Sequence, residues 1–372
     1  MKKLKILTVF GTRPEVIKLA PFIKVIEDDL DCISITCATT QHRELQNGIL
    51  DLFKIIPSYD LDIMVEGQDL FYITSSILEK IKIILEKEIP DYVVVHGDTT
   101  TAFASALAGF YKKIPIIHIE AGLRTGNIYS PFPEEANRSL ISKLAKLHMA
   151  PTLIAVNNLA KEDIVKNVFM VGNTIVDSVR WVLDNCLPFS EFVKEKIKSP
   201  QKKILITVHR RENFGNPLIN ICAAVKNLCN IHSEYRFVWP VHPNPSIRDV
   251  VYKCLTEIKN LDLIEPLIYS DLLLFINSCS LILSDSGGIQ EEACILGKKI
   301  IILREDTERP EVVKAGFGVL AGADQEKIFN YFQRIIKNKD FDNYSLTNIG
   351  CQIYGMPGVA KNILLKIKEI DN

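Results

Sequence analysis

The sequence predicts an α/β protein with two doubly wound, Rossmann-like domains, each built on a mainly parallel sheet. Short β-branched runs alternate with longer amphipathic segments along the whole chain, as in repeated βαβ units. The run Tyr92-Val93-Val94-Val95 is continuously apolar, which is typical of a strand whose sheet is covered by helices on both faces. The length of 372 residues suits two domains at about 150 residues each.

The first domain is expected over residues 1–187. Helical patterns separate its predicted strands, so the loops at the carboxyl ends of the strands should share one edge of the sheet. These strands cover residues 5–10, 33–38, 92–96, 114–119 and 169–171.

A linker is expected at 188–202, where prolines, serines and a lysine-rich stretch interrupt the pattern. The alternation then restarts in a second domain over 203–356. An amphipathic helix is expected within 357–372, and it could pack back on the first domain or on the second. Predicted strands of the second domain cover 204–208, 237–241 and 281–283, then 300–303, with one more strand ahead of a helix over 271–278.

Composition and charge exclude several classes of protein. Hydrophobic residues make up 47% of the chain and charged residues 24%, as in ordinary globular proteins. The formal net charge of −1 leaves no global positive field for nucleic acid or an anionic membrane. No apolar run reaches the roughly 20 residues that span a bilayer or has the form of a signal peptide. Nine scattered cysteines lack C-x-x-C spacing, so we expect a cytoplasmic protein without a disulfide framework.

The segment Gly11-Thr12-Arg13-Pro14-Glu15 directly follows the first strand. Thr12 and Glu15 have capping-box spacing, so a helix should begin here. Helix initiation does not require Arg13, and a helix amino terminus flanked by Arg13 and Lys18 makes a good phosphate site.

Three carboxylates are expected at one edge of the first sheet. Asp98 follows a strand and opens a helix, so it is either the helix N-cap or a ligand-facing carboxylate, and local signal favours the cap. Glu120 ends the next strand, where a charge has no core role. Glu134 stands in the first turn of a helix, where stabilisation of the helix dipole is the alternative role.

In the second domain, His209 and Arg210 follow the first strand, with a solvated run of charges as the alternative reading. His242 lies in a loop stiffened by prolines. Ser286, Gly287 and Gly288 lead from a strand into a helix whose free N–H groups can cradle a diphosphate.

Two further side chains complete this candidate nucleotide-diphosphate site. Glu292, one turn into the helix, could accept hydrogen bonds from ribose hydroxyls, and Arg309 could approach from the next loop. Since open α/β sheets bind ligands at this edge, the polar loops of both domains should line one cleft. A P-loop and a dinucleotide fingerprint in the right context are missing, so we predict no NAD, no other cofactor and no metal.

The ordered motifs resemble those of the non-hydrolysing UDP-N-acetylglucosamine 2-epimerases of bacteria, a family with the two-domain GT-B architecture. The resemblance runs nearly the full length of the chain. Its blocks are Gly11-Thr12-Arg13-Pro14-Glu15, Gln41-His42-Arg43-Glu44, His96-Gly97-Asp98-Thr99, Glu120-Ala121-Gly122-Leu123-Arg124, Pro133-Glu134-Glu135-Ala136-Asn137-Arg138, Gly172-Asn173-Thr174, His209-Arg210-Arg211-Glu212, Ser286-Gly287-Gly288 with Gln290-Glu291-Glu292, and Thr307-Glu308-Arg309-Pro310-Glu311.

The resemblance implies reversible epimerisation of UDP-N-acetylglucosamine to UDP-N-acetylmannosamine. UDP is eliminated to leave 2-acetamidoglucal and is then added back, and the product would feed surface polysaccharide synthesis. It also implies a homodimer. The implied catalytic residues are Asp98, Glu120, Glu134 and His209, and the implied UDP ligands are Arg13, Lys18, Ser286, Gly287, Gly288, Glu292 and Arg309.

Some family members bind a second UDP-N-acetylglucosamine as an allosteric activator. The matching positions here are Gln41, His42, Arg210 and His242. Gln46-Asn47-Gly48 departs from the family pattern, in which a further Gln is common, so the departure concerns activator binding more than catalysis.

Other functions fit parts of the sequence. A hydrolysing epimerase would release N-acetylmannosamine and UDP with much the same residues, and another epimerase would take a modified sugar because pocket shape selects the sugar. A GT-B glycosyltransferase would need an acceptor and often has a basic, apolar membrane-facing patch, which is not evident here. A non-catalytic sensor of nucleotide sugars would be expected to lack some of the three carboxylates.

Overall fold

The chain folds into two units. The computed structural model describes residues 2–40, 43–65, 67–337 and 353–371. The first unit comprises Met1–Ser178 with Tyr354–Asn372, and the second comprises Val179–Ile353. Helix α8 (Glu191–Lys198) lies within the expected linker at 188–202. The domain limits drawn from the sequence remain predictions.

The first unit contains a seven-stranded parallel sheet in the order β3-β2-β1-β4-β5-β6-β7. The chain builds outward from β1 to β3 and then returns to place β4 on the other side of β1, so the topological switch lies between β1 and β4. The strands are β1 (Leu4–Phe10), β2 (Cys32–Ala38), β3 (Tyr59–Asp60), β4 (Tyr92–His96), β5 (Ile116–Ile119), β6 (Leu147–Ala150) and β7 (Val168–Met170).

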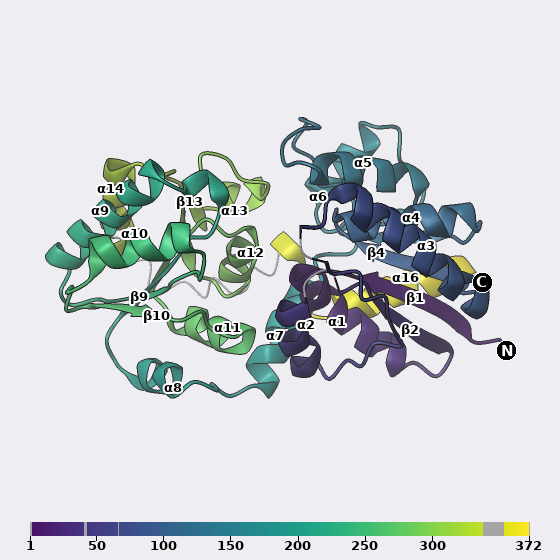
Figure 1. Ribbon diagram of the computed structural model, residues 1–372, viewed down its shortest axis with the longest axis horizontal. Helices are drawn as coiled ribbons and strands as arrows, with labels where there is room; N and C mark the ends of the chain where they lie inside the picture. Colours follow the sequence, from purple (N-terminus) through teal and green to yellow (C-terminus); the bar gives the residue numbers. More distant parts are fainter. Residues whose placement is uncertain (1, 41–42, 66, 338–352, 372) are drawn as a thin grey trace. The chain divides into compact units, whose positions relative to one another are not determined.

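Between these strands, apolar residues recur at helical spacing, so the connecting segments form amphipathic helices. The helices cover a core of the sheet that includes the fully buried Leu7, Val93 and Ile77. The carboxyl-terminal helix α16 (Val359–Asp371), yellow in Figure 1, packs on α1 within this unit. Asp177 accepts hydrogen bonds from the backbone N–H groups of Gly358 (2.6 Å) and Ala360 (2.7 Å) at the start of α16. The other helices are α1 (Arg13–Glu27), α2 (Arg43–Leu52), α3 (Leu70–Glu88), α4 (Thr100–Tyr111), α5 (Glu134–Leu144), α6 (Leu153–Ala160) and α7 (Ile175–Asn185), which continues into the second unit.

The second unit contains a six-stranded parallel sheet in the order β10-β9-β8-β11-β12-β13. Its topological switch lies between β8 and β11, whose last residues, Thr207 and Ser284, are paired in register. The strands are β8 (Lys203–Thr207), β9 (Arg236–Pro240), β10 (Leu261–Ile264), β11 (Leu281–Ser284), β12 (Lys299–Ile302) and β13 (Gly318–Leu320).

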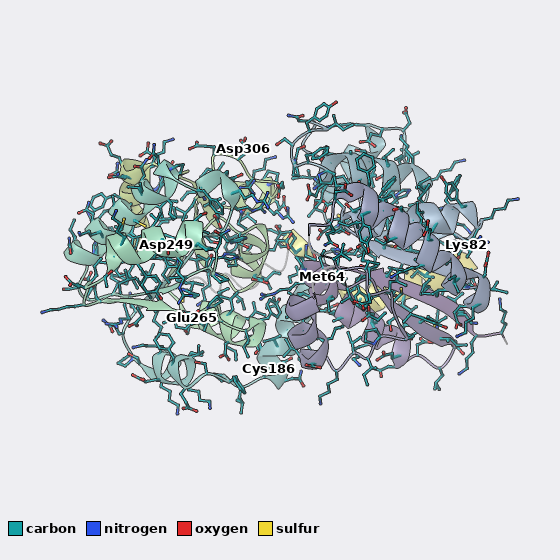
Figure 2. The ribbon with its side chains drawn as sticks, viewed as in Figure 1. Met64, Lys82, Cys186, Asp249, Glu265 and Asp306 are labelled. Carbon is teal, nitrogen blue, oxygen red and sulfur yellow. The ribbon has the colours of Figure 1, made fainter. Side chains whose placement is uncertain are left out.

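The core of the second unit packs large side chains such as Trp239, Phe237 and Phe332 between the sheet and its helices. Many charged side chains are exposed, and Figure 2 labels Asp249 and Glu265 in this unit and Lys82 in the first unit among them. The helical elements are the 3-10 turn η1 (Arg211–Asn213) and the helices α9 (Asn216–Ile231), α10 (Pro245–Leu255), α11 (Tyr269–Ser278), α12 (Gly287–Ile295), α13 (Pro310–Lys314) and α14 (Gln325–Lys337).

The predicted α/β class with parallel, doubly wound sheets is confirmed. Two strands of the first sheet, β3 and β6, were not predicted: β3 has only two residues, and Leu147-His148-Met149-Ala150 lacks a β-branched run. Within the described residues, no helix is both long enough and apolar enough to cross a membrane.

Candidate functional site

The predicted site residues gather at the carboxyl ends of strands, beside the switch point of each sheet. In the first unit the loops after β1, β4 and β5 carry Arg13, Asp98 and Glu120. In the second unit the loops after β8 and β11 carry His209 and Ser286. Ligands of open α/β sheets bind at such positions, because diverging connections leave a crevice there.

The loop after β1 is organised by Glu15. Its carboxylate accepts hydrogen bonds from Gly11 N (3.0 Å), Thr12 N (2.8 Å) and the Thr99 hydroxyl (2.7 Å), so it ties the β1 loop to the β4 loop. Thr12 is the N-cap of α1, as the capping box predicts, and Arg13 is the first residue of the helix. Burial raises the pKa of Glu15 to about 7, although these hydrogen bonds oppose the shift.

This raised pKa predicts a pH-dependent stability. The protonated form of Glu15 favours the folded state fully below about pH 4.5, and this contribution is lost as the pH rises through about 7. The contribution to the free energy of unfolding is about 3–4 kcal/mol, at about 1.4 kcal/mol per pKa unit. Glu15→Gln should therefore gain stability relative to the wild type between pH 5 and 8, measured as the difference in Tm. A pH-independent difference would show that the pKa of Glu15 is ordinary.

Asp98 lies one residue before the N-cap of α4. The cap is Thr99, whose hydroxyl accepts a hydrogen bond from Ala102 N (3.0 Å), so the capping role that local sequence favoured for Asp98 is wrong. Instead, the Asp98 carboxylate accepts a hydrogen bond from the buried Arg138 guanidinium, and its carbonyl accepts one from Asn137 Nδ2 (2.9 Å). Two residues of α5 thus fix the orientation of Asp98.

Glu120 is the most constrained of the three carboxylates. It is 9% exposed, and its Oε2 accepts hydrogen bonds from Lys18 Nζ and from Asn173 Nδ2 (3.0 Å), with His96 Nε2 at 3.8 Å. Its φ of 62° lies in the left-handed region, which costs a non-glycine residue roughly 1–3 kcal/mol and is found most often at functional sites. Lys18, predicted among the UDP ligands, is therefore a partner of Glu120.

Glu134 is the first residue of α5, after the N-cap Pro133. One turn further along the same helix, Arg138 contacts Asp98 and also pairs with Glu135 (3.1 Å). The amino-terminal turn of α5 is thereby attached to the β4 loop. The three predicted carboxylates consequently belong to three neighbouring elements at one edge of the first sheet.

In the second unit, His209 is held by Asp285. Asp285 is fully buried, and its Oδ1 lies 3.1 Å from Nδ1 of the His209 ring. The same carboxylate accepts hydrogen bonds from the backbone N–H groups of His209 (3.0 Å) and Arg210 (2.9 Å) and from Asn213 Nδ2 (2.9 Å). Burial alone would raise the pKa of Asp285, but these contacts hold the pKa below its usual value.

The two residues of the second unit predicted for activator binding lie beside this pair. The His242 ring stacks on the His209 ring with centroids 6.2 Å apart, and burial together with His209 lowers the pKa of His242. The Arg210 guanidinium lies next to Gly287, since a Cβ atom placed on this glycine would lie 3.5 Å from Nη2 of Arg210. Gln41 and His42, the other predicted activator residues, lie outside the described residues.

The start of α12 has the features of a diphosphate cradle. Ser286 is its N-cap, and Gly287 and Gly288 open the helix, so the first N–H groups are available in the absence of bulky side chains. The Arg309 guanidinium also approaches Gly287, since a Cβ placed there would lie 3.8 Å from its Cζ. Glu292 is buried in the same helix.

Arg309 is held at this position by two carboxylates. Its Nε donates to Oε1 of the buried Glu291 (2.8 Å), and its Nη1 donates to Glu308 (3.0 Å). Arg210 and Arg309 thus place two guanidinium groups beside a helix amino terminus, where both favour bound phosphate.

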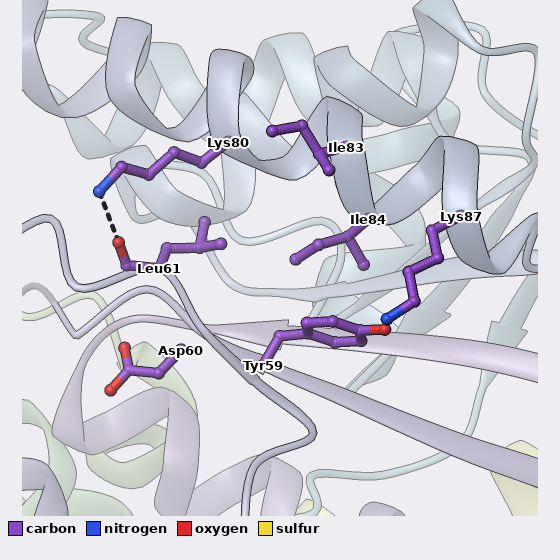
Figure 3. A pocket seen from close by; sticks show the side chains of 7 residues that line it. All are labelled: Tyr59, Asp60, Leu61, Lys80, Ile83, Ile84 and Lys87. Atoms are coloured by element: carbon purple, nitrogen blue, oxygen red, sulfur yellow. Dashed lines mark hydrogen bonds between the residues drawn. The ribbon is translucent and has the colours of Figure 1, made fainter.

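A metal site or a second ligand pocket could also lie elsewhere in the described chain. No group of three or more His, Cys, Asp or Glu side chains in the described ranges could hold a metal ion. A pocket at the edge of the first sheet, between β3 and α3, is lined by Tyr59, Lys80 and Lys87 among others (Figure 3). None of the predicted site residues lines this pocket.

The structure adds residues to the candidate site that sequence reasoning did not assign. Asp285 stands directly after a strand, the same signal that marked Glu120, and Asn173 lies in a block of the family resemblance without an assigned role. Arg138 and Glu291 also lie in blocks of the resemblance without an assigned role, and each acts through a contact that only the folded chain creates.

Comparisons with known proteins agree on one family. Residues 24–368 match the sequence profile described as UDP-N-acetylglucosamine 2-epimerase. The UDP-N-acetylglucosamine 2-epimerase of Escherichia coli K12 is 44% identical over 373 residues, which cover 98% of this chain and 99% of that protein. The crystal structure of the UDP-GlcNAc 2-epimerase of Neisseria meningitidis bound to UDP-GlcNAc has a TM-score of 0.89 at 41% identity, covering 98% of this chain and 100% of that one.

A more distant structure supports the fold. A spinosyn rhamnosyltransferase complexed with thymidine diphosphate has a TM-score of 0.63 at 14% identity, covering 99% of this chain and 100% of that one. At this identity the similarity concerns the fold alone. Together with the epimerase structures, it confirms the predicted GT-B fold class.

Proposed function

The chain belongs to the UDP-N-acetylglucosamine 2-epimerase family, and we propose that it converts UDP-N-acetylglucosamine reversibly to UDP-N-acetylmannosamine without releasing the free sugar. The observation that carries the proposal is the setting of Glu120: a buried carboxylate, in a strained backbone conformation, held by Lys18 and Asn173. Such a group is poised to exchange a proton with a bound substrate.

The reaction needs an elimination because C2 of the sugar lies beside no carbonyl. A carboxylate removes the C2 proton while the bond between C1 and the diphosphate oxygen breaks, so the electron pair forms the C1=C2 double bond of 2-acetamidoglucal. UDP then attacks C1 again, and a proton is delivered to the opposite face of C2. Acid and base groups are required on two sides of the ring.

The three carboxylates Asp98, Glu120 and Glu134 supply the proton transfers in this proposal. Each of two carboxylates is oriented by a cation, since Asp98 is paired with Arg138 and Glu120 with Lys18.

The remaining site residues serve the diphosphate. The amino terminus of α12, with Ser286, Gly287 and Gly288, favours negative charge, and Arg309 adds a guanidinium fixed by Glu291. Arg13 and His209 stabilise the charge that develops on the departing UDP, and Glu292 binds the nucleoside. For Lys18, the role proposed here is to pair with Glu120 and not to bind UDP.

Proton NMR of the purified protein with UDP-N-acetylglucosamine in D2O, without added nicotinamide or metal, tests the proposal. The expected result is a mixture of UDP-N-acetylglucosamine and UDP-N-acetylmannosamine that carries deuterium at C2. Free N-acetylmannosamine with UDP would assign the hydrolysing reaction instead. An unchanged spectrum would reject this substrate and favour a modified sugar or an acceptor-dependent transferase.

The same resemblance leads us to propose a homodimer and a role in surface polysaccharide synthesis. The cytoplasmic location remains a prediction from the sequence. An activating second substrate molecule near Arg210 and His242 also remains a proposal, and a sigmoidal dependence of rate on substrate concentration would support it.

A further inference from the structure

Asp285 and His209 are brought together by the topology of the second sheet. Strands β8 and β11 are neighbours, and Thr207 is paired with Ser284 at their carboxyl ends. Asp285 is the first residue after β11, and His209 is the second after β8. The contact between their side chains is therefore built into the switch point at which the ligand is expected.

We propose that Asp285 is a positioning residue that keeps the proton of His209 on Nδ1, so that Nε2 is the atom His209 presents to the substrate. The inference rests on the proposed function, in which His209 acts on the departing UDP. An ionised carboxylate has only acceptor atoms, so the ring nitrogen that faces it must carry hydrogen.

The two carboxylate oxygens of Asp285 have different main partners. Oδ2 accepts from Arg210 N (2.9 Å), Asn213 Nδ2 (2.9 Å) and His209 N (3.0 Å) and so anchors the loop after β8. Oδ1 accepts a longer hydrogen bond from the same His209 N–H (3.2 Å), and it lies 3.1 Å from His209 Nδ1, where it fixes the ring. Loop anchoring and ring orientation can therefore be separated experimentally.

The surroundings of the ring leave Nε2 as the working nitrogen. Asp285 lies at Nδ1, and the His242 ring stacks on one face of the imidazole at a centroid distance of 6.2 Å. The His209 side chain is 40% exposed, whereas that of Asp285 is fully buried. Arg210, the next residue along the chain, approaches Gly287 at the start of α12.

Asp285→Asn tests the proposal because it keeps the size of the side chain and replaces one carboxylate oxygen, a hydrogen-bond acceptor, with an NH2 group, a donor. Arg210 N and Asn213 Nδ2 donate to Oδ2 alone and require the amide oxygen there, so the amide nitrogen must face the His209 ring. That nitrogen donates, which forces the proton of the neutral His209 ring from Nδ1 to Nε2. A similar change in another enzyme with a histidine–aspartate pair left the geometry intact and lowered kcat about 10⁴-fold.

The primary measurement is NMR of free protein with 15N-labelled histidine, at a pH at which the His209 ring is neutral. His209→Gln identifies the signal by its absence. The expected result is protonation at Nδ1 in the wild type and at Nε2 in Asp285→Asn. Protonation at Nε2 in the wild type would overturn the proposal, and this spectrum decides the tautomer even where the buried substitution impairs folding. It also needs no activity, so it is independent of the proposed function.

Steady-state kinetics provide the second measurement. Asp285→Asn should lower kcat by about 10²–10⁴-fold with a much smaller change in KM. Asn213→Ala removes a loop anchor but retains the contact between Asp285 and His209, so the tautomer should persist and the loss of kcat should be smaller. Equal losses of kcat in both variants with an unchanged tautomer would reduce Asp285 to an anchor of the loop.

Discussion

Replacing Glu120 by Gln is expected to lower turnover by at least about 10³-fold while UDP binding survives. General acid–base groups contribute typically 10² to 10⁴-fold, and a glutamine of the same shape can neither take up nor return a proton at C2. The proposed UDP ligands Ser286, Gly287 and Arg309 lie in the other unit of the chain, so the variant leaves them unchanged. Rates of epimerisation and of C2 deuteration, with calorimetric titration of UDP, measure both effects.

A matched control is Glu265→Gln, which makes the same chemical change at an exposed residue that pairs with Arg248 (3.0 Å). This control should keep wild-type rates, because exposed ion pairs contribute little. Turnover near the wild-type rate in Glu120→Gln would remove Glu120 from the mechanism. Loss of UDP binding in the same variant would instead assign Glu120 to ligand binding or to the fold.

The positions of Asp98 and Glu120 were predictable because parallel strands end at the same edge of a sheet. Asp98 and Glu120 follow the neighbouring strands β4 and β5, and the sequence places both directly after apolar runs. Their partners were not predictable. The hydrogen bond from Asn173 to Glu120 joins residues 53 positions apart, and that from Arg138 to Asp98 joins residues 40 apart. Such contacts depend on side-chain conformations that no periodic pattern encodes.

The elements of the fold also differ in how far the sequence predicts them. Continuous apolar runs gave the bounds of β4 correctly, because both faces of that strand are buried. Strand β6 lacked such a run, since His148 interrupts it, and only its pairing with β5 and β7 makes it a strand. Helix α11 begins at Tyr269, two residues before the expected start at 271, because its N-cap is Ile268 rather than a polar residue.

Replacing Lys18 by Met should destabilise the protein by about 3–5 kcal/mol, because removal of one partner of a buried ion pair leaves the other charge uncompensated. The side chains of Lys18 and Glu120 are 7% and 8% exposed, and their contact joins α1 to the loop after β5. The double variant Lys18→Met/Glu120→Gln should recover part of the loss, since no unpaired charge remains. Urea unfolding of the wild type, both single variants and the double variant measures the coupling free energy.

Lys24→Met is the matched control, because Lys24 lies on the same helix and its pair with Glu27 (2.8 Å) is about one-third exposed. It should cost about 1 kcal/mol or less. The cycle also separates the two roles considered for Lys18. If Lys18 were also a ligand of UDP, Lys18→Met would weaken UDP binding. If it acts only as the partner of Glu120, UDP binding should persist while kcat and stability fall together, because Glu120 loses the contact that holds its carboxylate.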